Sequence, residues 1–234
     1  MYNSRSSMNL EKHYTGLWEN ALQQFKAGAF EPDLFLNSTE DDRFGLTLLF
    51  RPEEAVKESI GALLRELRQA EPAQYFYPAS DLHVTVMSVI SCHAGFRLSH
   101  IDSAAYINVL RKCLADVKSF RVDFRGITAS PSCIMVQGFP ASGQLNDLRD
   151  KLRESFRKTS LQQTMDSRYI LRTAHITVAR FKEPLHNPAA FLDNLQAYRN
   201  HSFGSTEVHH IELVYNDWYQ RQADVQNVCN FRLK

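Results

Sequence analysis

The sequence has few of the features that define several large classes of protein. Its four cysteines, Cys92, Cys113, Cys133 and Cys229, form no CxxC pair in a chain of 234 residues. We therefore expect reduced thiols in a cytoplasmic protein and no disulfide scaffold. No run approaches the roughly 18 apolar residues of a membrane span, and residues 1–9 lack the apolar core of a signal peptide. The sequence thus predicts neither a membrane protein nor a secreted one.

An excess of charge of one sign is also missing, since 27 basic residues face 26 acidic ones. A net charge of +1 does not predict a surface for a long nucleic-acid duplex, although it is compatible with a small nucleotide or an RNA end. Metal-binding patterns are absent as well, because there is no HExxH, no acidic cluster and no Cys/His ligand spacing. We therefore expect no metal ion and no cofactor.

What the chain does have is enough hydrophobic residues, 44% of the total, to form a sizeable core. Residues 10–30 carry apolar side chains at three- and four-residue steps, which indicates a helix. A polar segment follows as far as residue 42. We interpret residues 1–42 as a helical extension and connector packed on a main domain that comprises residues 43–234.

Strand and helix patterns alternate through the main domain, and one order of elements occurs twice. We expect strands at 44–50, 82–90, 120–128, 133–139, 176–181, 208–215 and 225–233, and helices at 53–69, 103–117, 144–158 and 188–198. Residues 44–117 and 133–198 both read strand, helix, strand, helix. The pattern predicts an α+β fold with two similar lobes, whose antiparallel sheets surround a central cleft.

The second strand of each repeated unit begins with a His-hydrophobic-Thr motif, namely His83-Val84-Thr85 and His175-Ile176-Thr177. Alternate residues of a strand share a face, so each His and Thr project together while their apolar neighbours point into the core. One such motif would most simply be a pair of half-buried strand residues. Two motifs at corresponding places indicate one shared site.

This set of side chains suits the chemistry of phosphoesters. Displacement at phosphorus needs a base on the attacking oxygen and an acid on the leaving oxygen, and two imidazoles can supply both. The phosphoryl oxygens carry negative charge that fixed donors stabilise, and the two threonine hydroxyls can provide them. We therefore interpret His83, Thr85, His175 and Thr177 as the catalytic residues.

At these motifs the sequence resembles the 2H phosphoesterase superfamily, the RNA 2′,3′-cyclic phosphodiesterases or 2′-5′ RNA ligase-like proteins. The matching segments are Asp81-Leu82-His83-Val84-Thr85-Val86 and Ala174-His175-Ile176-Thr177-Val178-Ala179-Arg180-Phe181. The resemblance covers residues 43–233 in element order and is specific only at the motifs. It implies a two-lobed fold that opens a cyclic phosphate on RNA or a nucleotide, giving a 2′-phosphate, without a metal ion.

The resemblance also implies roles for the four motif residues. His83 would be the general acid on the leaving oxygen, and His175 would be the general base on water. Thr85 and Thr177 would hold the phosphoryl oxygens. Because the site is nearly symmetric, the acid and base roles of the two histidines could also be exchanged.

Four further residues are candidates for binding the substrate. Arg180 stands where the family often has an arginine, but simple alternation puts it on the face opposite His175 unless a bulge redirects it. Phe181, Tyr77 and Trp218 are aromatic residues that could stack on a base, and core packing is the competing explanation for each.

The basic residues of the helix at 144–158, Arg149 among them, alternate with acidic ones, which indicates a solvated face. For the whole protein we predict a monomeric phosphodiesterase acting on the cyclic phosphate of an RNA end, an oligonucleotide or a small nucleotide. The alternatives are a nucleotide-binding module of the same fold without turnover, another hydrolase or transferase reaction at the same site, and a 2′-5′ RNA ligase-type activity. No adenylating lysine motif supports ATP-driven ligation.

Overall fold

Two antiparallel sheets face each other in the computed structural model, which describes the backbone of residues 3–234 and the side chains of residues 10–234. The first sheet has the order β3 (Val84–Ala94), β1 (Arg43–Phe50), β8 (His210–Asp217) and β9 (Gln226–Arg232). The second has the order β2 (Tyr75–Phe76), β6 (Ile176–Arg180), β5 (Cys133–Pro140), β4 (Phe120–Ser130) and β7 (Ser202–Val208). The predicted α+β class with two antiparallel sheets is confirmed.

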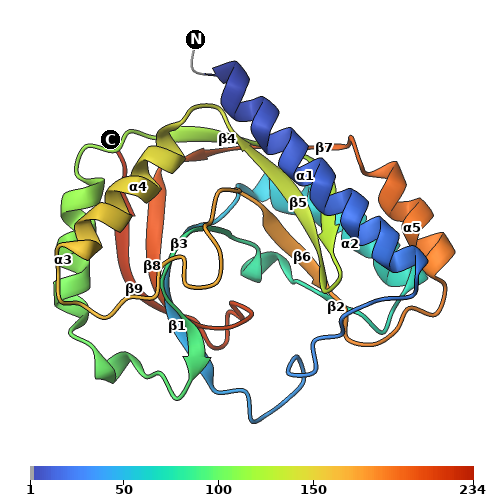
Figure 1. Cartoon of the computed structure of the whole chain (residues 1–234), viewed down its shortest axis with the longest axis horizontal. Coiled ribbons are helices and arrows are strands. Elements are labelled where there is room, and N and C mark those ends of the chain that lie inside the picture. The colour runs from blue at the N-terminus through green and yellow to red at the C-terminus, as the bar shows by residue number, and fades with distance from the viewer. Residues whose placement is uncertain (1–2) are drawn as a thin grey trace.

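Five helices surround the sheets: α1 (Asn3–Lys26), α2 (Glu54–Ala70), α3 (Ser103–Leu114), α4 (Gln144–Arg157) and α5 (Pro188–Ala197). Helix α2 follows a strand of the first sheet but packs on the second, whereas α4 follows a strand of the second sheet and packs on the first (Figure 1). The two repeated units therefore exchange their first helices. This crossover joins the two halves into one core.

The helices form where the apolar spacing predicts them. Five residues of α2 at helical spacing are completely or almost completely buried: Val56, Ile60, Leu63, Leu64 and Leu67. Asp102 caps α3 by accepting a hydrogen bond from the backbone N–H of Ala104 at 3.0 Å. The strand β7 was not predicted, because Ser202–Val208 contains small and polar residues at the sheet edge.

Helix α1 lies along β4 and β5, with α2 behind them (Figure 1). Tyr14, Trp18 and Phe25 of α1 are at most 5% exposed. The hydroxyl of Thr128, in β4, donates to the carbonyl oxygen of Tyr14 at 2.9 Å. The helix therefore shares the core with the two sheets, and a domain boundary at residue 42 stays a prediction.

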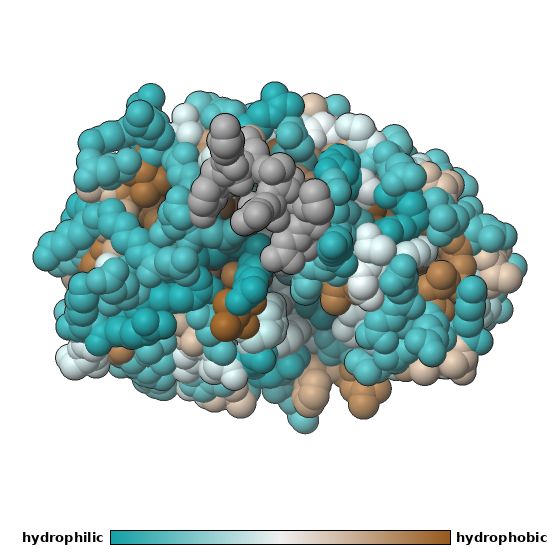
Figure 2. Space-filling model, turned by 45° about the horizontal axis from the view of Figure 1, so that its top comes forward, coloured by the Kyte–Doolittle hydropathy of each residue, from teal (hydrophilic) through white to brown (hydrophobic). Residues whose placement is uncertain are grey.

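The face of the molecule in Figure 2 is largely hydrophilic, with scattered apolar residues. Within the described part of the chain, none of the helices combines the length and the apolar character that crossing a bilayer requires.

Candidate active site

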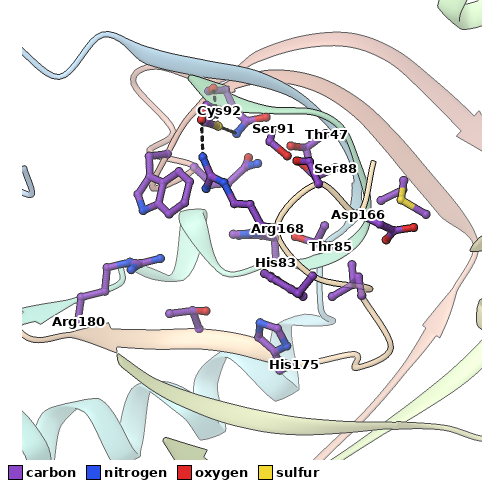
Figure 3. A pocket seen from close by; sticks show the side chains of 18 of the residues that line it. Thr47, His83, Thr85, Ser88, Ser91, Cys92, Asp166, Arg168, His175 and Arg180 are labelled. Atoms are coloured by element: carbon purple, nitrogen blue, oxygen red, sulfur yellow. Dashed lines mark hydrogen bonds between the residues drawn. The ribbon is translucent and has the colours of Figure 1, made fainter. Parts of the chain in front are cut away.

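A cavity of about 260 Å³ lies between the two sheets, at the place where the two motifs meet. His83 and Thr85 reach it from the start of β3, and His175 and Thr177 reach it from the start of β6 (Figure 3). These are the four residues that the sequence assigns to catalysis. The structure thus brings two motifs that are distant in the chain to one cavity.

Each motif strand has a β-bulge three residues after its histidine. In the pairing of β1 with β3, the partners of Leu48 and Leu49 are two residues apart, so Val86 has no partner. In the pairing of β5 with β6, the same irregularity leaves Val178 without a partner. Such an extra residue shifts the alternation of side chains by one position.

The bulges decide which side chains follow the histidines into the cavity. Ser88 and Arg180 each stand five residues after a motif histidine, and both line the cavity. Without the bulge at Val178, Arg180 would point to the opposite face. Of the two alternatives that the sequence leaves open for Arg180, the structure shows the bulge.

The two histidines differ in the hydrogen-bond partner of their Nδ1 atoms. The Nδ1 atom of His83 is 2.8 Å from the carbonyl oxygen of Asp81, which can only accept, so this nitrogen carries a proton. The Nδ1 atom of His175 is 2.7 Å from the hydroxyl of Thr173, which can donate or accept. Both contacts leave the Nε2 atoms of the histidines available to a substrate.

Burial lowers the pKa of both imidazoles to about 4. For His83, the hydrogen bond to the Asp81 carbonyl opposes this shift. For His175, the positive charges of Arg149 and Arg180 lower the pKa further. The charges of Arg51, His175 and Arg180 also lower the pKa of His83, so both imidazoles are neutral at neutral pH. They differ in that only His83 has a contact, the Asp81 carbonyl, that raises its pKa.

Arg149 was expected on a solvated face of its helix, and this prediction is wrong. Its side chain is completely buried, because position 149 lies on the same face of α4 as the buried Leu145 and Leu152. The guanidinium donates to the carbonyl oxygens of Val86 at 2.9 Å, Thr85 at 3.0 Å and Thr173 at 2.7 Å. It thus connects the bulge of the first motif with the segment that precedes the second.

Three side chains hold Arg180 at the cavity wall. Its Nε donates to the hydroxyl of Tyr77 at 2.9 Å, and its Nη1 lies 3.7 Å from a carboxylate oxygen of Asp33. Its guanidinium carbon is 5.5 Å from the ring centre of Tyr219, whose hydroxyl donates to Asp33 at 2.9 Å. Tyr77 therefore contacts Arg180 at the cavity edge, and Asp33 brings the connector after α1 into the site.

Of the two other aromatic candidates, one lies in the core and one lines the cavity. Phe181 is 1% exposed and packs against Phe25, Phe30 and Phe191, so its predicted contact with substrate is wrong. Its position immediately after Arg180 turns it into the core. Trp218 does line the cavity, but two guanidinium groups lie on its ring, and these would have to move before a base stacks there.

The sequence reasoning missed Ser88 and Arg168, which line the cavity, and Arg149, which is buried behind the two motifs. A signal existed for Arg149 in its helical spacing, and for Ser88 in its position five residues after His83, which repeats that of Arg180 after His175. No pattern singles out Arg168, which lies in the long loop between α4 and β6. No group of three or more metal-binding side chains is present among residues 10–234.

Comparison with known proteins gives a family and a fold. The profile of the 2′-5′ RNA ligase superfamily matches residues 52–219. No curated protein sequence is similar enough to this chain to count as a match.

Several solved structures share the fold. The crystal structure of TT0787 of Thermus thermophilus has a TM-score of 0.57 at 16% identity, covering 81% of this chain and 97% of that one. E. coli LigT complexed with 3′-AMP has a TM-score of 0.52 at 12% identity, covering 82% and 99%. A structure described as a phosphoesterase has a TM-score of 0.53 at 15% identity, covering 82% and 99%.

Proposed function

The chain belongs to the 2′-5′ RNA ligase superfamily, and on that premise we propose that it is a metal-independent cyclic phosphodiesterase. Its substrate would be the 2′,3′-cyclic phosphate of an RNA end, an oligonucleotide or a small nucleotide, and its product a phosphomonoester. The observation that carries this proposal is the meeting of both His–Thr pairs at one cavity. LigT of E. coli, which shares the fold, has been crystallised with 3′-AMP, NADP⁺, phosphate and ATP.

In the proposed reaction, His175 takes a proton from water as the water oxygen attacks phosphorus. His83 gives a proton to the ribose oxygen as its bond to phosphorus breaks. The assignment follows the family resemblance, and one contact supports it: the Asp81 carbonyl raises the pKa of His83, whereas His175 has no such contact and Arg149 opposes its cationic form. A bound anionic phosphate raises the pKa of both imidazoles above these low values.

The negative charge on the phosphoryl group would be met by donors already in place. Thr85 and Thr177 stand beside the histidines and offer hydroxyl groups, and Arg180 offers a fixed guanidinium. Arg149 lies directly behind the Thr85 peptide and adds a buried positive charge. Donors held in position before the reaction need no reorganisation in the transition state.

We further propose that the protein works as a monomer in the cytoplasm. Both His–Thr pairs lie within one chain, so the proposed chemistry requires no residue from a second copy. The four cysteines form no disulfide in the structure, which is compatible with a reducing compartment.

The test is turnover of 2′,3′-cyclic nucleotides in the presence of EDTA, followed by phosphorus NMR. The wild type should open the ring, and His83→Ala and His175→Ala should each lower kcat by at least about 100-fold. His209→Ala is the matched control, since that histidine is exposed and outside the cavity, and it should leave kcat unchanged.

Other outcomes would decide against the proposal. Turnover that survives in both histidine variants would move the chemistry to another site. Binding of the nucleotide without any turnover in the wild type would favour the binding module. Joining of a cyclic-phosphate end to a 5′-hydroxyl RNA end, without net hydrolysis, would favour the ligase-type activity.

A further inference from the structure

The cavity has a second basic residue, Arg168, whose guanidinium contacts Cys92, near the opposite end of β3 from His83 and Thr85. Its guanidinium carbon lies 4.4 Å from the ring centre of Trp218. Its Nη2 donates to the carbonyl oxygen of Cys92 at 2.9 Å (Figure 3). These two contacts hold an exposed arginine at the cavity wall, beside Ser91.

Arg168 is the arginine of the cavity whose charge is least compensated. It has no carboxylate within 4 Å among the residues whose side chains are described, whereas Arg43, which also lies on Trp218, is held by both oxygens of Asp41 at 2.7 Å. Arg180 has Asp33 nearby, as described above. The hydrogen bond to Cys92 uses one of the five N–H donors of Arg168, which leaves the others for a ligand.

The carboxylate that lines the cavity does not neutralise this charge. Asp166 is paired with Arg153 on α4, at 2.5 Å and 3.1 Å through two hydrogen bonds. Arg168 and the buried Arg149 behind the motifs therefore carry two positive charges without a carboxylate partner among residues 10–234, whereas a cyclic phosphate brings one negative charge. Charge complementarity favours a ligand with a second phosphate.

The length of β3 between Thr85 and Cys92 sets how far apart the two phosphates of such a ligand must be. Thr85 pairs with Leu49 and His93 pairs with Phe44, so the two ends of this part of β3 are five residues of β1 apart. At about 3.3 Å per residue, the backbone of His93 lies roughly 16 Å from that of Thr85. Cys92, whose carbonyl oxygen accepts the hydrogen bond from Arg168, stands immediately before His93. One phosphate group cannot bridge that separation, whereas a chain of successive phosphodiesters can.

We propose that Arg168, together with Trp218 and Ser91, forms a second phosphate subsite. It holds an internucleotide phosphate of a single-stranded oligonucleotide whose terminal cyclic phosphate lies between His83 and His175. This inference rests on the proposed function and narrows its substrate class from any cyclic phosphate to an oligonucleotide end. A free cyclic mononucleotide fills only the catalytic part of the cavity.

The experiment compares three substrates with the same 3′-terminal base, each ending in a 2′,3′-cyclic phosphate: a mononucleotide, a dinucleotide and a tetranucleotide. In the wild type, kcat/KM should rise with length. Arg168→Met should lower kcat/KM for the tetranucleotide by about fivefold, as the loss of one exposed ion contact implies, and leave the mononucleotide value within about twofold. It should also reduce the salt dependence for the tetranucleotide by about one counterion.

Arg172→Met is the matched control, because Arg172 is an exposed arginine of the same loop that does not line the cavity. It should leave all three substrates unchanged. Equal losses on the mononucleotide and the tetranucleotide in Arg168→Met would overturn the subsite, and so would a wild type that shows no length dependence. Both results leave the proposed function intact.

A second measurement separates the subsite from the chemistry. Fluorescence anisotropy with His175→Ala protein follows binding of the labelled tetranucleotide without turnover. Weaker binding in His175→Ala/Arg168→Met than in His175→Ala supports the subsite, even if the wild type fails to open any of the cyclic phosphates. Equal binding rejects it.

Discussion

Arg149 is completely buried, and its contacts link it to both motifs of the candidate site. Arg149 has no carboxylate partner among the side chains of residues 10–234, and it is satisfied by backbone carbonyls and by Asn146 Oδ1 at 3.2 Å. Burial lowers the pKa of Arg149 to about 10, so the side chain remains charged at neutral pH. A buried cation is costly, and here it stands behind the peptide of Thr85 and also donates to the carbonyl oxygen of Thr173, two residues before His175.

The positive charge of Arg149 lowers the pKa of His175, and its removal can be tested. Arg149→Met should raise the pKa of His175, because a neighbouring positive charge that disfavours the imidazolium is removed. The pKa of His83 should not rise and serves as an internal control, because the main charges that act on it are those of Arg51, His175 and Arg180. NMR titration of the two imidazole Cε1–H signals measures both values.

A second substitution at Arg149 separates the effect of its hydrogen bonds to the three carbonyl oxygens from the effect of its charge. Arg149→Lys keeps the positive charge but cannot reach three carbonyl oxygens, so the pKa of His175 should stay low while kcat falls. Both variants should lose of the order of ~2–4 kcal/mol of stability, since buried carbonyls lose their donors. An equal rise of both histidine pKa values in Arg149→Met would indicate a general loosening of the cavity and contradict the specific effect.

At the scale of elements, the second motif depends on a close approach of two backbones. Gly138 in β5 has no room for a side chain, because a Cβ there would lie 1.9 Å from the carbonyl oxygen of Ala174. The hydroxyl of Tyr14 also lies here, donating to the carbonyl oxygen of Gly138 at 3.2 Å. The residue immediately before His175 is thus fixed by β5 and by α1 together.

Gly138→Ala should therefore displace the segment before His175. We expect a loss of about 1–3 kcal/mol in the free energy of unfolding, and a lower kcat, because overpacking against backbone has no flexible neighbour to absorb it. Urea unfolding and the phosphorus NMR assay measure the two effects. Gly61→Ala in α2 is the control, since its nearest contact is the flexible end of Arg65 at 3.6 Å, and it should stabilise by about 0.5–1 kcal/mol. A Gly138→Ala protein as stable and active as the wild type would contradict the close approach.

For the molecule as a whole, the two neutral histidines between the sheets make stability depend on pH. The pKa of each is about 4 in the folded protein against an ordinary value of 6.5. The folded state therefore binds fewer protons than the unfolded chain between these values, and the free energy of unfolding falls as the pH falls from about 6.5 towards 4. Each histidine should contribute a loss of about 2 kcal/mol at about pH 5.

Thermal unfolding at pH 7 and at pH 5 tests this expectation. The melting temperature of the wild type should fall between the two values, and that of His83→Gln/His175→Gln should fall less. Added inorganic phosphate should reduce the loss in the wild type, because a bound anion stabilises the protonated imidazoles. The same fall in the wild type and the double variant would assign the pH dependence to other groups.

The sequence by itself determined the four catalytic candidates and most of the elements, because alternation within a strand and helical spacing are local properties. His83 and Thr85 share a face whatever surrounds them, and so do His175 and Thr177. The repeated order of elements was enough to pair the two motifs. The strand β7 was not predicted, because its residues acquire their strand character from pairing with β4.

Only the tertiary structure decided which further side chains enter the cavity. The bulge at Val178 turns Arg180 inward and Phe181 into the core, and a bulge depends on the register of the neighbouring strand, which no local pattern encodes. Arg149 needed the carbonyls of β3 and of the segment before β6 to satisfy its hydrogen-bond donors. Asp33 and Arg168 come from irregular segments, whose positions are set by the packing around them and not by a periodic pattern.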